Sequence, residues 1–180
     1  MGQDLPTDLS PYSTPDTFGI KDIRAILEKY CTGKRCLDIG CGTLPRPAYM
    51  IEETEWAGID PLDGERDFEF VQSDAENIPF EDSIFDACLF ATSIDHLKDP
   101  VQAIREAHRV LKPGGYVIIW LGIRPRQKYA KWLRKGGWYN ERHPWAFTKE
   151  SLIGLMKEFE LMETVNIKFN DYIFVFGCTE

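Results

Sequence analysis

Short apolar runs that alternate with turn and helix signals constrain the fold of this chain more than any other feature. The runs have lengths typical of strands, and they are Arg35–Ile39, Trp56–Ile59, Phe68–Val71, Phe85–Phe90 and Tyr116–Trp120. Apolar residues at helical spacing precede the first run, from Gly19 to Tyr30. A second helix is predicted after Asp99-Pro100, a cap followed by a first-turn proline, and it stops at Lys112-Pro113. Strands alternating with helices predict an α/β fold with a doubly wound, mostly parallel sheet.

The C-terminal part follows a different pattern. Thr148 and Ser151 open a predicted helix whose apolar positions are Leu152, Leu155, Met156 and Phe159. Two β-rich runs, Thr164–Phe169 and Tyr172–Gly177, follow and are separated by the turn residues Asn170-Asp171. We therefore expect an antiparallel hairpin strand at the end of the parallel sheet.

Length and composition favour one domain. A chain of 180 residues with 43% hydrophobic residues can bury one substantial core. Residues 1–18, rich in Pro, Asp, Ser and Thr, are predicted to be a flexible arm, and residues 19–180 the domain. The arm has no basic segment followed by an apolar one, so no secretory signal is expected.

Charge and cysteine content exclude several classes of protein. A net charge of −8 gives no overall attraction to nucleic acid or to an anionic membrane. No apolar run approaches the roughly 20 residues that a membrane-spanning helix needs. The 5 cysteines form an odd set without a C-x-x-C pair, and the histidines have no ligand spacing. We predict reduced thiols, a cytoplasmic location and no metal site.

Acidic residues and glycines follow the predicted strands. Asp38 comes at the end of the first strand and leads into Gly40 and Gly42, which let a backbone approach a ligand closely. The helix expected after this turn would offer its N–H groups. Asp60 ends the second strand about 20 residues later, and Asp74 follows the third. Open α/β sheets bind ligands at this edge, so a site is predicted there.

The stretch from Lys34 to Trp120 resembles the class I S-adenosylmethionine-dependent methyltransferases, especially those acting on small molecules. The motifs that carry the resemblance are LDIGCGT, GIDP, SDAENIPFEDSIFDACLF and HLKDPVQAIREAHRVLKPGGYVII. The resemblance implies a Rossmann-like fold, S-adenosyl-L-methionine as cofactor, and methyl transfer to an O, N or C atom of a small-molecule acceptor. It also implies cofactor-binding residues, which are Asp38, Gly40, Cys41 and Gly42 around the methionine part, Asp60 and Pro61 at the ribose, Asp74 and Ala75 at the adenine, and Ala91 nearby.

A nicotinamide enzyme is the nearest alternative with a similar fold. A dinucleotide pyrophosphate is anionic and favours G-x-G-x-x-G without an adjacent carboxylate. Here Asp38 lies two residues before Gly40, and Pro45 occupies the position of the third glycine. S-adenosylmethionine carries an ammonium and a sulfonium instead of phosphate, so an acidic pocket favours the methyl donor.

Two departures from the family pattern affect the structure that we expect. Prolines at positions 45 and 47 follow the glycines and reshape the loop and the start of the next helix. Only residues 61–67 separate the second and third strands, fewer than the dozen or so of an ordinary parallel crossover. We expect a turn or loop there, and a thinly covered flank that a second copy of the chain would cover in a homo-oligomer.

Two histidines are candidate catalytic residues. His96 follows the fourth strand near the expected methyl position, where a local structural role is an equal alternative. His143 lies in Arg142-His143-Pro144-Trp145, where the family has acceptor-binding elements, and is a candidate general base. His108 belongs to the helix after Asp99 and is expected to be structural.

The segment 122–147 is a candidate acceptor lid. It contains 7 basic residues and 1 acidic residue between positions 124 and 142, interleaved with aromatics. This composition suits an anionic or aromatic acceptor, and an amphipathic surface helix with a solvated basic face is an equal alternative. Contact with nucleic acid is disfavoured because the rest of the chain is acidic.

A function of a different class is a non-catalytic, methyltransferase-like binding or assembly protein. The short arm and the trimmed crossover are the features that favour it. A degenerate relative of this kind should bind S-adenosylmethionine weakly or not at all, so titration with the cofactor separates the two hypotheses.

Overall fold

One sheet organises the chain. The computed structural model describes residues 19–123 and 144–179. The sheet has 7 strands in the order β3-β2-β1-β4-β5-β7-β6. Their bounds are β1 Arg35–Ile39, β2 Glu55–Asp60, β3 Glu69–Gln72, β4 Phe85–Ala91, β5 Leu111–Gly122, β6 Phe159–Lys168 and β7 Asp171–Cys178. Strands β1 to β5 pair in parallel, and β7 is antiparallel to both β5 and β6. The predicted Rossmann-like sheet with a C-terminal antiparallel hairpin is confirmed.

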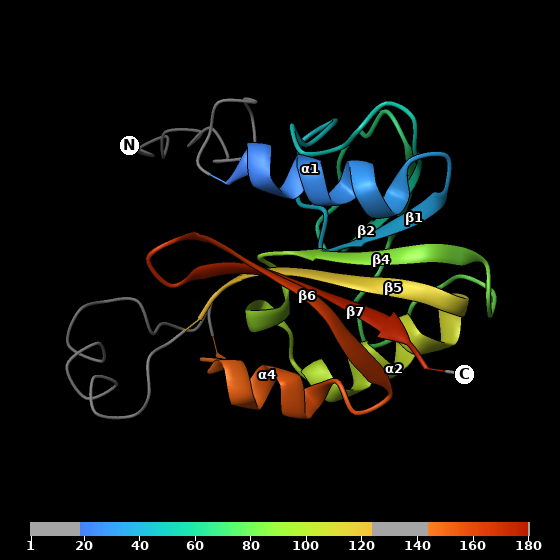
Figure 1. The fold of residues 1–180 in the computed structure, drawn as a ribbon. Helices are drawn as coiled ribbons and strands as arrows, with labels where there is room; N and C mark the ends of the chain where they lie inside the picture. The colour runs from blue at the N-terminus through green and yellow to red at the C-terminus, as the bar shows by residue number, and fades with distance from the viewer. Residues whose placement is uncertain (1–18, 124–143, 180) are drawn as a thin grey trace, which may run out of the picture.

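Helices cover both faces of the sheet (Figure 1). Helix α1 (Ile20–Cys31) lies on one face, while α2 (Pro100–Val110) and α4 (Lys149–Leu155) lie on the other. The core is accordingly divided into two apolar clusters, one centred on α1 and one on α2 and α4. Among the described residues, no helix is both long and apolar enough to cross a membrane.

Local sequence explains where α2 and α4 begin. The Asp99 side chain accepts hydrogen bonds from the backbone N–H groups of Val101 and Gln102, and Pro100 is the first helical residue. Thr148 and Ser151 form a reciprocal capping box at the start of α4. Both predicted helix starts are therefore confirmed.

The predicted end of the second of these helices is wrong. Helix α4 ends at Leu155, and Phe159 is the first residue of β6, paired with Cys178 of β7. Pairing with β7 extends the strand over residues whose apolar spacing also suits a helix. The hairpin turn is at Phe169 and Asn170, one residue earlier than expected, and Phe169 has a φ of 50°.

No helix lies between β1 and β4, a region that is described throughout. The predicted loop between β2 and β3 is confirmed, whereas the helix expected after Gly42 is absent. Proline lacks an N–H and disfavours helical conformation in the residue before it, so Pro45 and Pro47 explain this absence. The three strands at one end of the sheet are consequently joined by irregular segments.

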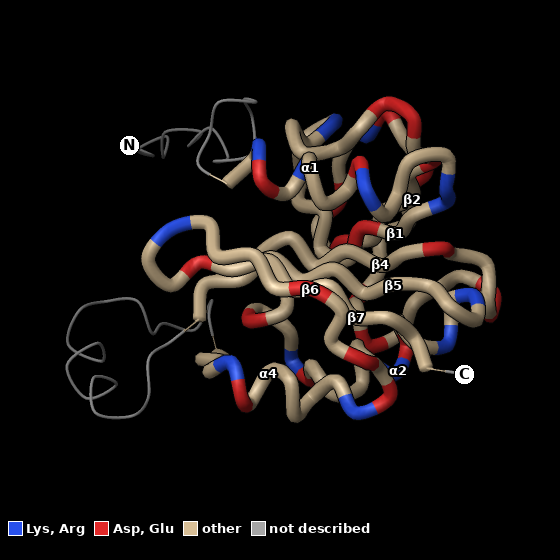
Figure 2. The backbone as a smooth tube through the Cα atoms, in the orientation of Figure 1, with Lys and Arg blue, Asp and Glu red and all other residues tan. Residues whose placement is uncertain are grey.

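Arginine side chains hold two of these segments. Arg24 of α1 donates from Nη1 to the carbonyls of Ala48 and Met50, both at 3.1 Å. Arg66 donates to the carbonyl of Gly42 and lies 4.3 Å from the centre of the Phe70 ring. Figure 2 shows charged residues of both signs spread over loops, helices and strand ends. Among these charged residues, Arg24 and Arg66 have a structural function, because they bind backbone carbonyls of irregular segments.

Candidate functional site

A cavity of about 550 Å³ opens at the C-terminal ends of β1 to β4. It is lined by residues from the loops that follow these strands, as expected for an open α/β sheet. Eight of the predicted cofactor-binding residues line it, and they are Gly40, Cys41, Gly42, Asp60, Pro61, Asp74, Ala75 and Ala91. The fold therefore brings motif residues from four separate loops into one place.

The turn after β1 forms the floor of the cavity. Gly40 has a φ of 79°, and a Cβ atom there would lie 2.5 Å from the Cβ of Ser93. Gly42 has a φ of 72°, and a Cβ there would meet no atom within 4 Å. The first glycine is thus needed for close packing, while the second permits the left-handed turn and leaves open space above it.

Asp60 connects the turn after β1 to the loop after β2. Its Oδ2 accepts from the N–H of Gly42 at 2.9 Å, and its Oδ1 accepts from the N–H of Leu62 at 2.9 Å. The side chain is mostly buried and still lines the cavity. Each carboxylate oxygen has a further lone pair, so Asp60 can also accept from ligand hydroxyls.

Asp38 lies next to the cavity with no exposed surface of its own. The hydroxyl of Tyr49, which lines the cavity, donates to its Oδ2 at 2.7 Å, while Oδ1 is buried without a hydrogen-bond partner. Burial raises the pKa of Asp38 to about 7, although the Tyr49 hydrogen bond opposes the shift. Burial therefore makes the ionised form of this carboxyl group unfavourable for folding, although the group lies beside the cavity.

Residues after β3 form another wall. Ser73, Asp74, Ala75 and Glu76 all line the cavity. The ammonium of Lys98 lies 2.9 Å from Oδ2 of Asp74 in an exposed ion pair. With Asp60, Asp74 and Glu76 on its walls and Lys98 at its rim, the cavity suits a ligand with hydroxyl groups and positive charge.

The loop after β4 closes the remaining side. Ala91 and Thr92 line the cavity, and Thr92 has a φ of 57°. The Ser93 hydroxyl donates to the carbonyl of Ile39 and so ties this loop to β1. Strained backbone geometry, as at Thr92, is typical of functional loops. The buried hydrogen bond from Ser93 to Ile39 holds this loop in place.

The two candidate histidines differ in what the structure describes. His96 lines the cavity at the end of a 3-10 helix (Ile94–His96), and its Nε2 lies 3.8 Å from Oδ1 of Asp95. His143 lies outside the described residues, as does most of the predicted acceptor lid. Within the two described ranges, no group of three His, Cys, Asp or Glu side chains could hold a metal ion.

Sequence reasoning missed the residues that support the motif. Tyr49 comes from the segment expected to be a helix, and Arg66 from the short loop after β2. Neither belongs to a recognisable motif, because each acts on a residue distant in sequence. The proline pair after Gly42 was the available signal that this segment would supply individual side chains rather than a helix end.

Comparison with known proteins identifies a family for the same region. Residues 37–119 match the family model described as a methyltransferase domain. A phthiotriol/phenolphthiotriol dimycocerosates methyltransferase of Mycobacterium ulcerans is 32% identical over 114 residues, 56% of this chain and 42% of that protein. A fatty-acid O-methyltransferase of Mycolicibacterium smegmatis is 35% identical over 116 residues, 57% of this chain and 42% of that protein. The chain thus spans about two fifths of these relatives.

Solved structures share the fold at low sequence identity. A protein from Pyrococcus horikoshii superposes with a TM-score of 0.73 and 21% identity, over 96% of this chain and 94% of that one. The Burkholderia thailandensis 1,6-didemethyltoxoflavin-N1-methyltransferase superposes with a TM-score of 0.72 and 16% identity, over 97% of this chain and 80% of that one. That structure contains S-adenosylhomocysteine.

Replacing Asp38 by Asn should stabilise the protein at alkaline pH. The pKa of Asp38 is about 7 in the folded state and near 3.8 when unfolded, so ionisation destabilises the fold progressively as pH rises through this window. Asn carries no charge and can still accept from Tyr49. We expect Asp38→Asn to raise the free energy of unfolding by about 2 kcal/mol at pH 8, part of the gain being offset by burial of the amide.

Urea unfolding between pH 4 and pH 8 measures this effect. The gain should shrink as pH falls below 7 and disappear near pH 4. The exposed Asp63, changed to Asn, is the matched control. A gain that does not change with pH, or a loss at pH 8, would contradict the prediction.

Proposed function

We propose that the chain is a class I S-adenosylmethionine-dependent methyltransferase, which transfers a methyl group from S-adenosylmethionine to a small-molecule acceptor. The observation that carries the proposal is the cavity at the ends of β1 to β4, where eight motif residues meet. The names of the two mycobacterial relatives, which include a fatty-acid O-methyltransferase, support a small-molecule acceptor.

The residues of the cavity fit this cofactor. Asp60 can accept hydrogen bonds from ribose hydroxyls in addition to those from Gly42 and Leu62. Space above Gly42 and the acidic lining suit the cationic methionine part. Asp38, behind Tyr49, would add negative charge in its ionised form, which a nearby cation favours. Asp74 and Ala75 would flank the adenine, with Ala91 beside the cofactor.

The proposed reaction needs mainly alignment. The bound cofactor supplies an electrophilic methyl group on a sulfonium sulfur. The chain holds the donor rigidly through the loops after β1, β2 and β3, so that the acceptor atom can approach in line with the carbon–sulfur bond. As the bond from the acceptor to the methyl carbon forms, the carbon–sulfur bond would break and leave S-adenosylhomocysteine. Where the acceptor atom carries a proton, a histidine side chain would take it.

The first test concerns Asp60. Asp60→Ala should weaken binding of S-adenosylhomocysteine by about 1 to 3 kcal/mol, because a charged acceptor for the ribose hydroxyls is lost. Isothermal titration calorimetry measures the affinity. Asp63→Ala in the same loop is the control, since Asp63 does not line the cavity. Equal affinities for Asp60→Ala and the wild type would remove Asp60 from the binding site.

The second test concerns the acceptor side, for which we propose the segment 122–147 as a lid. His143 is the proposed general base and His96 the alternative. His143→Asn should lower turnover on the order of a hundredfold, with the affinity for S-adenosylhomocysteine unchanged. Release of S-adenosylhomocysteine in the presence of the acceptor measures turnover. Full turnover in His143→Asn together with its loss in His96→Asn would transfer the role to His96.

The third test concerns assembly. Leu62 is 60% exposed in the loop after β2, on the flank without a helix. We propose that a second copy of the chain covers this flank. Leu62→Ser should weaken self-association in sedimentation velocity experiments, whereas Val101→Ser, an exposed apolar position on α2, should not. A wild-type protein that stays monomeric at high concentration would rule out the proposal.

A further inference from the structure

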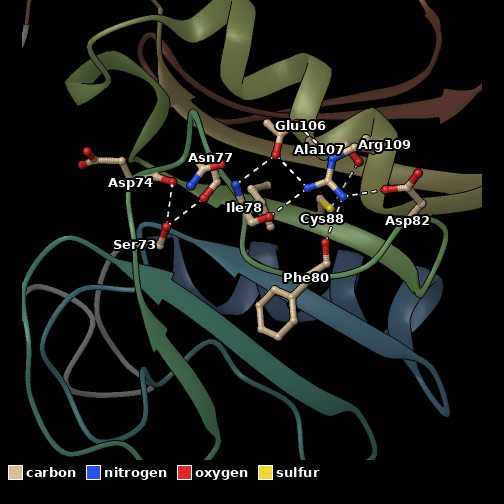
Figure 3. A network of polar contacts seen from close by, with 10 residues as sticks. All are labelled: Ser73, Asp74, Asn77, Ile78, Phe80, Asp82, Cys88, Glu106, Ala107 and Arg109. Carbon is tan, nitrogen blue, oxygen red and sulfur yellow. Dashed lines mark hydrogen bonds and ion pairs between the residues drawn. The ribbon is translucent and has the colours of Figure 1, made fainter.

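An arginine and a glutamate on α2 hold the segment that joins β3 to β4. Residues 73–84 form this connection without a helix, and residues 73–76 line the cavity. Arg109 donates to the carbonyls of Ile78 and Phe80 at 2.8 and 2.9 Å (Figure 3). Oε2 of Glu106 accepts from the N–H of Ile78 at 3.0 Å. One helix turn therefore satisfies three backbone groups of an otherwise irregular segment.

The two side chains also hold each other. Arg109 donates from Nε and Nη2 to the two carboxylate oxygens of Glu106, at 3.0 and 2.7 Å. A second ion pair, to Asp82 at 2.7 Å, is largely exposed and contributes little. The hydrogen bonds from Arg109 lower the pKa of Glu106, so the carboxylate stays ionised at neutral pH. This paired arrangement leaves the guanidinium with a defined direction toward the carbonyls.

The contacts of Arg109 and Glu106 reach the cavity wall through a hydrogen-bonded turn formed by residues 73–77. The Ser73 hydroxyl donates to the carbonyl of Asn77 at 2.8 Å, and the N–H of Asn77 donates to the carbonyl of Asp74 at 3.2 Å. Ile78, directly after this turn, is bonded at both its N–H and its carbonyl by the α2 pair, as Figure 3 shows. The position of Asp74 and Ala75 is thus coupled to Arg109 through one turn of backbone.

We propose that Arg109 and Glu106 are positioning residues for the adenosine half of the cofactor, a role that rests on the proposed function. They touch no ligand themselves. They keep the wall made by residues 73–76 in its binding geometry before the ligand arrives, so the ligand does not have to order the segment on binding.

The test compares binding of two ligands to matched variants. Arg109→Gln should weaken both S-adenosylhomocysteine and 5′-methylthioadenosine by a similar factor, on the order of tenfold, because both contain the adenosine half. Arg105→Gln, an exposed arginine on the same helix, should leave both affinities within about twofold. Titrations are made well below the unfolding temperature of every variant.

A second arginine separates the adenosine side of the cavity from general stability. Arg24→Gln removes the same kind of two-carbonyl contact at the segment 48–50, which carries Tyr49 on the proposed methionine side of the cavity. It should therefore lower the unfolding temperature and weaken S-adenosylhomocysteine more than 5′-methylthioadenosine, which lacks the amino-acid group. The Ile78 amide should also exchange with deuterium faster in Arg109→Gln than in the wild type. If Arg109→Gln does not fold, Arg109→Lys replaces it, because lysine keeps the charge but cannot reach both carbonyls.

Each outcome decides a different point. Wild-type affinity for 5′-methylthioadenosine in Arg109→Gln, or an equal loss in Arg24→Gln, overturns the positioning role while the proposed function stands. Failure of the wild-type protein to bind either ligand overturns the proposed function, and the positioning role with it.

Discussion

Hydrogen bonds from arginine side chains to backbone carbonyls are the interaction on which the ligand-binding half of this fold depends. Strands β1 to β4 are joined by segments without helices, so many of their carbonyls have no partner in a regular element. A guanidinium is planar and carries five N–H donors, which lets one side chain serve two carbonyls at once. Arg24 and Arg109 each do so from a helix, one on either face of the sheet.

The cavity takes its shape from these contacts. Gly42, whose carbonyl is held by Arg66, is also bound through its N–H to Asp60, so the turn after β1 is fixed from two directions. On the opposite wall the α2 pair performs the corresponding function. The loops after β1, β2 and β3 contain no helix, yet they form most of a cavity of about 550 Å³. The cost is that single side chains, rather than whole elements, determine the geometry.

The sequence predicts the motif positions better than their supports. Asp38, Asp60 and Asp74 each follow an apolar run, and parallel pairing brings such strand ends together whatever the details of the loops. Tyr49 and Arg109 bind residues that are 11 and 31 positions away in the sequence, namely Asp38 and Ile78. The periodicity of the sequence does not predict such contacts. The prediction of a helix after Gly42 was wrong, because two prolines prevent the helix that usually follows the first strand of this fold. Phe159 joined a strand because pairing with β7 outweighed its helical spacing.

The uneven distribution of helices along the sheet affects how the native protein opens locally. Strands β4, β5 and β7 contribute to the apolar clusters on both faces of the sheet, whereas β3 is a 4-residue edge strand without a buried residue. Segments with few packed neighbours open at lower free energy than the core, so the edge of the sheet at β3 forms the weaker cooperative unit. A ligand that binds only the closed form stabilises that unit in proportion to the logarithm of its concentration. Cofactor supply would thus determine how long this end of the molecule survives proteases.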